Sequence, residues 1–170
     1  MSETYGTAAE SDYIEIPQPD DIPIREREDA MGAYFMMFAS LAAGLPFPII
    51  NLIAAVVYHF VNKSKSRFVH FHSLQSVLSQ LPTTLINAVA VIWFVRLLIK
   101  EADFPDIFLG YLAMAAVVNI LYFAFSIVAA VRARRGRMFY FLFFGRISYH
   151  YAFLNKEKVE RQHVNAPPKL

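Results

Sequence analysis

The chain has 170 residues, of which 56% are hydrophobic, 18% are charged and none is cysteine. A soluble domain carries about 25% charged residues, so this composition, with a mean hydropathy of +0.38, favours a membrane protein. The absence of cysteine excludes disulfides, zinc–thiolate sites, iron–sulfur clusters and thiol nucleophiles. The charges are segregated, because long uncharged stretches separate the amino-terminal residues, two short loops and the carboxyl-terminal end.

Residues 1–29 form an acidic tail that contains Pro17, Pro19 and Pro23. This acidic start fits neither a secretory signal nor an organelle transit peptide, so we predict a protein of the bacterial cytoplasmic (inner) membrane. We expect the tail to be solvated and to dock on a partner protein. At the other end, residues 155–170 are expected to form a polar, exposed tail.

Residues 30–154 are predicted to form a helical membrane domain with about three crossing segments. The first, residues 31–61, would be about 46 Å long as one helix, against a hydrocarbon core of about 30 Å. Gly44, Pro46 and Pro48 interrupt it. It therefore either crosses once with a kink or enters and returns as two half-helices.

The second and third crossing segments are residues 68–99, in which Pro82 is expected to cause a kink, and residues 107–131. Residues 138–154 are strongly aromatic but too short to span, and aromatic residues beside Arg and His suit the membrane interface. The predicted fold is thus all-α, a polytopic transmembrane helical bundle with a Pro-broken first segment and an interfacial aromatic segment near the carboxyl end.

Basic residues are concentrated in two short loops, 62–67 and 132–137, whereas the loop between them holds Lys100 against three acids. The positive-inside rule places the two basic loops on the cytoplasmic side and residues 100–106 outside. The amino terminus lies outside if residues 31–61 cross once, and inside if they form a hairpin. We assign the basic residues to topology and lipid headgroups, not to nucleic acid. They are Lys63, Lys65, Arg67, Arg132, Arg134, Arg135 and Arg137.

A polar stripe runs along the second segment. At 100° per residue, seven polar side chains fall within an arc of roughly 140°, and in a bilayer they need partners. They form a helix–helix interface, the wall of a hydrated groove or pore, or a small-ligand site. Asn119, in the third segment, is expected to bond across an interface to Asn87 or Asn51. The stripe consists of His72, Gln75, Ser76, Ser79, Gln80, Thr83 and Asn87.

No pattern of an enzyme is present. The hydrophobic segments lack Asp and Glu, which disfavours ion-coupled transport, and His72 with Ser76 has no acidic partner for nucleophilic catalysis. His59, His70 and His72 could converge at the cytoplasmic face, but His70 and His72 point about 200° apart on a helix. We therefore expect no catalytic residue, no metal site and no cofactor.

The run SRFVHFHSLQSVLSQLP, residues 66–82, carries a more specific pattern. A basic residue is followed by an aromatic, a polar–aromatic pair, a small residue, an apolar residue and Gln. With the helix layout of residues 31–150, this pattern resembles the small four-helix membrane family that includes the channel-like component of the chloroplast inner-envelope protein import translocon. The motif positions are Arg67, Phe68, His70, Phe71, Ser73, Leu74 and Gln75.

The resemblance implies a non-enzymatic subunit of a larger membrane complex, linked to protein translocation or membrane-protein handling. Its partners would be membrane lipids and other membrane proteins, such as secretion or insertion machinery. Two alternatives stay open: a purely structural accessory subunit, and a small channel or His-based metal or redox protein. Self-association into a homo-oligomer is also left open.

Overall fold

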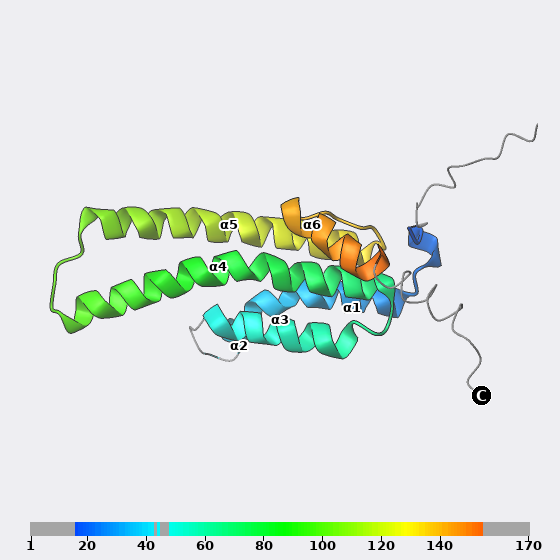
Figure 1. The fold of residues 1–170 in the computed structure, drawn as a ribbon, viewed down its shortest axis with the longest axis horizontal. Coiled ribbons are helices and arrows are strands. Elements are labelled where there is room, and N and C mark those ends of the chain that lie inside the picture. Colours follow the sequence, from blue (N-terminus) through cyan, green and yellow to red (C-terminus); the bar gives the residue numbers. More distant parts are fainter. Residues whose placement is uncertain (1–15, 43, 45–47, 155–170) are drawn as a thin grey trace, which may run out of the picture.

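The structure is a computed structural model that describes residues 16–42, 44 and 48–154, and every secondary-structure element in these ranges is helical (Figure 1). The predicted all-α fold is confirmed for this part of the chain. Residues 1–15 of the acidic tail and the polar tail 155–170 lie outside the described residues. The elements are η1 (Pro19–Asp21), α1 (Ile24–Phe35), η2 (Met36–Phe38), α2 (Ala39–Ala42), α3 (Pro48–Asn62), α4 (Arg67–Ile99), α5 (Asp106–Arg134), α6 (Leu142–Tyr149) and the π-helical turn η3 (His150–Leu154).

The first hydrophobic stretch turns back on itself. α3 begins at Pro48, a position where proline fits because the first helical N–H has no intrahelical acceptor. The Ser40 backbone N–H donates to Asn51 Oδ1 at 2.7 Å and ties the two arms together near the turn. Of the two arrangements that the sequence left open, the structure has the hairpin. The start of α1 therefore lies at the same end of the molecule as the loop after α3 (Figure 1).

The amino-terminal residues 16–29 are not a separate tail. α1 starts at Ile24, so the boundary predicted at residue 29 falls within this helix. Before it, Ile22 is 3% exposed and belongs to the hydrophobic core. The last part of the acidic segment thus packs against the rest of the chain.

α4 and α5 form one long antiparallel hairpin joined by residues 100–105. α4 begins after Ser66, whose Oγ accepts a hydrogen bond from the Val69 N–H at 3.2 Å and caps the helix. The helix continues through Pro82, and Figure 1 shows that α4 is bent rather than straight. The proline therefore does not end the helix.

The remaining helices surround only one half of this hairpin (Figure 1). We call this half the base: α1, α2, α3 and α6 together with the adjoining parts of α4 and α5. We call the other half, where α4 and α5 lie beside each other up to the loop 100–105, the hairpin end. Both basic loops, 62–67 and 132–137, lie at the base.

Small residues let α1 pack closely on α5 in the base. Ala30 of α1 clusters with Ala129, Ala130 and Ala133 of α5, and all four are at most 3% exposed. Such small side chains are typical of close helix–helix contacts in membranes. They bring the backbone of α1 within reach of polar groups on α4.

The outside of the molecule is largely apolar. Leu85, Ile92 and Ile120 are 60 to 66% exposed, whereas soluble proteins rarely expose apolar patches that extend over whole helices. α4 and α5 are long and apolar enough to cross a membrane, while the apolar part of α3 is shorter. The described chain thus has two helices of spanning length, one fewer than the number of crossings predicted, because residues 31–61 form a hairpin.

Candidate functional site

The polar stripe of α4 faces the inside of the base. Six of its seven side chains are at most 8% exposed, so they are enclosed within the base. The six are His72, Gln75, Ser76, Ser79, Gln80 and Thr83.

Gln75 connects three parts of the chain. Its Nε2 donates to the Tyr34 hydroxyl of α1 at 2.7 Å and to the Phe139 carbonyl at 2.9 Å. Its Oε1 accepts from the Phe141 backbone N–H at 3.1 Å. One buried amide therefore holds α1 and the segment before α6 against α4, and it satisfies two backbone groups that have left the helical pattern.

Tyr34 extends this network to His72. The Tyr34 hydroxyl lies 2.9 Å from His72 Nδ1. The hydroxyl also accepts from Gln75, so it links the amide and the imidazole. The His72 ring packs among the rings of Phe68 and Phe71, at centroid distances of 4.5 and 4.9 Å. His72 is 0% exposed and acts as a core residue.

The hydroxyls of the stripe differ in what they bind. Ser76 Oγ donates to the Ala33 carbonyl of α1 at 2.7 Å and thus joins two helices. Ser79 and Thr83 donate to the carbonyls of Ser76 and Gln80 in their own helix, at 3.0 Å each. Ser79 also hydrogen-bonds to the Tyr122 side chain of α5, so Ser76 and Ser79 both contribute cross-helix bonds.

Asn87 lies beyond the base and pairs with Asn119 of α5. Each amide donates to the other's oxygen, at 2.9 and 2.8 Å. The Tyr111 hydroxyl adds a bond to the Ile86 carbonyl at 2.9 Å. Of the two partners considered for Asn119, it is Asn87 that it contacts, whereas Asn51 accepts from Ser40.

His59 and His70 lie together, and His72 lies apart from them. His59 and His70 have ring centroids 5.3 Å apart, and His59 Nδ1 lies 2.9 Å from Ser73 Oγ. His72 lies on another side of α4, with Tyr34. Among the described residues, no group of three His, Asp or Glu side chains converges as a metal site.

The basic loops bind acidic residues of the same chain. Lys65 Nζ lies 2.7 Å from Asp29 Oδ2, and Arg134 Nη1 lies 2.7 Å from Glu28 Oε1. Arg27 donates to the carbonyls of Ile22 and Pro19 at 2.8 and 2.6 Å. The acidic segment next to α1 therefore docks in cis on the base, although the sequence suggested a separate partner.

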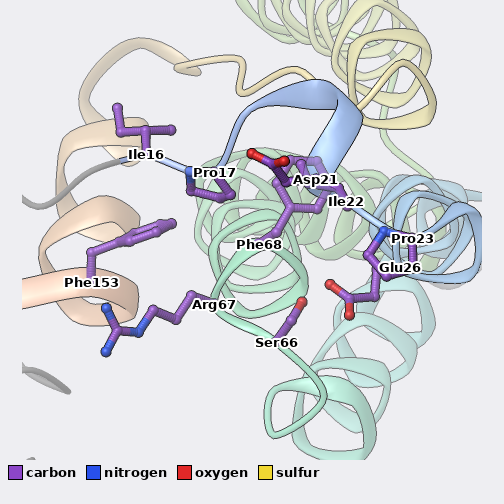
Figure 2. Close-up of a pocket in the computed structure, with 10 residues that line it drawn as sticks. All are labelled: Ile16, Pro17, Asp21, Ile22, Pro23, Glu26, Ser66, Arg67, Phe68 and Phe153. Carbon is purple, nitrogen blue, oxygen red and sulfur yellow. The ribbon is translucent and has the colours of Figure 1, made fainter.

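A cleft of about 620 Å³ opens at this end of the base (Figure 2). Figure 2 shows Arg67 and Phe153 on one side of it and Glu26 on the other. The lining mixes both signs of charge with apolar rings, so it presents no convergent set of groups for one chemistry. Ten residues line it: Ile16, Pro17, Asp21, Ile22, Pro23, Glu26, Ser66, Arg67, Phe68 and Phe153.

The loop at the hairpin end carries exposed carboxylates. Glu101, Asp103 and Asp106 are exposed, and Glu101 has the left-handed φ of 49° that ends α4. Phe104 stacks on Phe94 at 5.8 Å with an interplanar angle of 8°. The aromatic contact packs the short loop against α4, and its carboxylates are exposed to the surroundings.

The profile of the magnetosome magnetite crystal formation protein family (MamF/MmsF) matches residues 28–148. This match covers more than half of the chain and runs from α1 to α6. The chain belongs to the magnetosome magnetite crystal formation family. No curated protein and no solved structure matches it.

Membership in the magnetosome family corrects the interpretation of the sequence motif. The family is not the one that includes the chloroplast import component, so the roles in protein transport and in a translocon that this resemblance implied were wrong. The alternative of a structural accessory subunit is compatible with this family. The motif misled because aromatic, amide and small residues near the start of an apolar helix also serve packing. Phe68, Phe71, Ser73 and Gln75 are at most 2% exposed in the core.

Sequence reasoning missed two contributors to the base. Tyr34 is 2% exposed and is the main partner of the stripe on α1. The backbone of residues 139–141 supplies the other partners. Tyr34 could have been found as the one residue with a hydroxyl in its turn of α1, beside the small residues Ala30 and Ala33.

Proposed function

We propose that this protein is a non-enzymatic integral membrane component of magnetite crystal formation, which lies in the membrane that bounds the crystal. The observation that carries this proposal is the family match over residues 28–148, because these residues contain most of α1, all of α3, α4 and α5, and most of α6. In this account the buried polar stripe stabilises the base and has no catalytic role.

The dimensions of α5 support a membrane-crossing hairpin. The 25 residues from Ile107 to Val131 would span about 37 Å at 1.5 Å per residue, compared with a hydrocarbon core of about 30 Å. A modest tilt accommodates this difference. Charged residues flank the span at both ends, with Asp106 before it and Arg132 after it.

The distribution of charge sets the orientation. Lys63, Lys65 and the arginines of 132–137 all lie at the base, and basic residues in short loops stay on the cytoplasmic side. The loop 100–105 then lies on the opposite side, in the compartment of the crystal. Since α1 and α3 form a hairpin, the start of α1 is cytoplasmic too.

We assign the contact with the growing mineral to the loop at the hairpin end. Carboxylate oxygens are the ligands that hard cations prefer. Glu101 and Asp103 of the loop that Phe104 anchors, and Asp106 at the start of α5, present three exposed carboxylates. No three donors of the described residues converge, so this loop would meet a surface of ions and would not enclose a single ion.

The test replaces charges at one end at a time. A Glu101→Gln, Asp103→Asn double variant removes two carboxylates from the loop. The matched control, Asp20→Asn with Asp21→Asn, removes two exposed carboxylates at the base. A gene that encodes one of the two variants replaces the natural gene in the host. Electron microscopy then measures the dimensions of the magnetite crystals. A change of crystal size or shape for the loop variant alone supports the proposal, whereas wild-type crystals in both variants contradict it.

A further inference from the structure

The two halves of this molecule differ in width. At the hairpin end the described chain consists of α4 and α5, joined across their interface by Asn87 and Asn119. In the base α1 packs against both of these helices, and α3 and α6 pack against α4 (Figure 1). The cross-section therefore grows from two helices to five along the axis of the bundle.

The added helices end about half-way along the hairpin. Phe38, directly before α2, contacts Phe123 of α5 with ring centroids 5.8 Å apart. On the α6 side, Phe141 contacts Tyr122 and Phe125 at 6.1 and 5.6 Å. Both sets of contacts lie at the same level of α5, residues 122–125, about a third of the way into the predicted crossing 107–131 from its basic end, and only the short α2 continues the α1 arm after Phe38.

The outer faces of the added helices are apolar. On α3, Ile53, Val57 and Phe60 are 56, 57 and 61% exposed. On α6, Phe143 is 79% exposed and Ile147 is 44% exposed, one helical turn apart. Side chains of this kind belong in acyl chains and not in water. The added helices therefore insert into the leaflet on the basic side and do not lie outside the membrane.

Together these observations give the molecule the shape of a wedge in the bilayer. A helix with its side chains is about 10–12 Å across, so each occupies roughly 100 Å² of a leaflet. α1, α3 and α6 add on the order of 300 Å² to one leaflet and nothing to the other. A protein that expands one leaflet more than the other fits best where that leaflet is convex.

We infer that this protein acts as a wedge in the membrane. It prefers a bilayer that is convex on the side of the basic loops. The inference rests on the membrane placement under the proposed function. With the base on the cytoplasmic side, the favoured curvature is that of a small closed compartment seen from the cytoplasm. The chain would thus favour the curved membrane of a small compartment, in addition to making its proposed contact with the crystal.

The experiment measures sorting on membrane tethers. The full chain is reconstituted into giant vesicles of phosphatidylcholine and phosphatidylglycerol, from which a thin tether is pulled. Because the natural chain has no cysteine, a Ser64→Cys variant carries one fluorophore in the exposed loop after α3. An impermeant quencher separates the copies whose base faces out from those whose base faces in.

The two orientations serve as matched controls for each other. On the tether the outer leaflet is convex, so outward-facing copies are expected to be enriched relative to lipid and inward-facing copies depleted. Equal densities of the two orientations, or enrichment of both, overturn the inference. An alkaline carbonate wash of the same vesicles tests insertion itself. Loss of the protein in that wash overturns the proposed membrane placement as well, whereas retention without sorting overturns only the wedge.

A variant locates the source of the sorting. Phe143→Lys with Ile147→Lys would lift the outer face of α6 toward the headgroups, and the tether enrichment of outward-facing copies should fall. Phe143→Leu with Ile147→Leu keeps that face apolar and should sort like the natural chain. Sorting that is equal in all three proteins would exclude α6 from the wedge and contradict this assignment.

Discussion

Asn87 of α4 and Asn119 of α5 exchange two side-chain hydrogen bonds, at 2.9 and 2.8 Å. The pair lies at the hairpin end, where α4 and α5 are the only described helices. Both amides also lie in the most apolar part of the chain. In hydrocarbon a lone amide has no solvent partner, so each asparagine supplies what the other needs. The pair fixes the register of the hairpin and thereby the position of the acidic loop.

The pair should behave as a unit in a double-mutant cycle. Asn87→Leu leaves Asn119 Oδ1 without its donor, although Asn119 Nδ2 keeps its bond to the Ala115 carbonyl, and Asn119→Leu removes both bonds of Asn87, so each single variant should be destabilised. The double variant should lose less than the sum of the two, with a coupling of about 1 kcal/mol, because interhelical hydrogen bonds in membranes average about 0.6 kcal/mol each. Unfolding in mixed detergent–SDS micelles, followed by circular dichroism, measures the free energies. Strict additivity would show that the two amides do not interact.

Gln75→Leu should be among the most destabilising single changes in the stripe. It removes three hydrogen bonds and leaves the Phe139 carbonyl and the Phe141 N–H buried without a partner, at about 1–3 kcal/mol for each unsatisfied group. The same unfolding measurement applies. Thr83→Val is the control, since the Thr83 hydroxyl donates to the carbonyl of Gln80 in its own helix. Similar losses in the two variants would contradict the central place given to Gln75.

Gly145→Ala should displace α6. A Cβ at this position would lie 2.7 Å from Tyr140 Cα, a backbone atom that cannot rotate away. Overpacking of this kind costs about 1–3 kcal/mol. Gly110→Ala in α5 is the matched control, because nothing lies within 4 Å of its Cβ position and alanine favours the helix. We expect the first variant to unfold at lower SDS fraction and the second to be unchanged or more stable; the opposite order would be inconsistent with the packing of α6.

Arg27→Gln should release the acidic segment from the base. Arg27 donates to the carbonyls of Ile22 and Pro19, whereas the Glu28–Arg134 pair is exposed and such pairs contribute at most about 1 kcal/mol. Amide hydrogen exchange of residues 19–24 in nanodiscs should therefore accelerate in Arg27→Gln. Arg25 is an exposed neighbour of Arg27, so Arg25→Gln should leave the hydrogen exchange of this segment unchanged. Unaltered exchange in both variants would mean that other contacts hold the segment.

Hydropathy and charge were sufficient to predict the parts of this fold that depend on single segments. The lengths of α4 and α5 and the grouping of basic residues at one end follow from runs such as 107–131 and loops such as 132–137. The hairpin could not be decided, because Pro46 and Pro48 are compatible with a kink as well as with a reversal. That choice depends on tertiary contacts such as the one between Ser40 and Asn51.

The polar stripe was also predictable only in part. Helical periodicity predicted that His72, Gln75 and Ser76 lie on one face of a helix, and in the structure all three are buried on α4. What covers this face was not predictable, since Tyr34 is distant in sequence and the Phe139 and Phe141 partners are backbone groups that leave no trace in a sequence pattern. The short motif at Arg67–Gln75 was misleading about family because its buried residues satisfy packing that many membrane helices need.

The central claim, that the chain crosses the membrane of the crystal compartment with its base in the cytoplasm, is tested most directly by cysteine accessibility on isolated magnetosomes. The chain has no natural cysteine, so Ser64→Cys and Ala102→Cys each report one end of the molecule. We predict that an impermeant maleimide labels Ser64→Cys on intact magnetosomes, and labels Ala102→Cys only after the membrane is permeabilised. Labelling of Ala102→Cys on intact magnetosomes, with Ser64→Cys protected, would contradict the account.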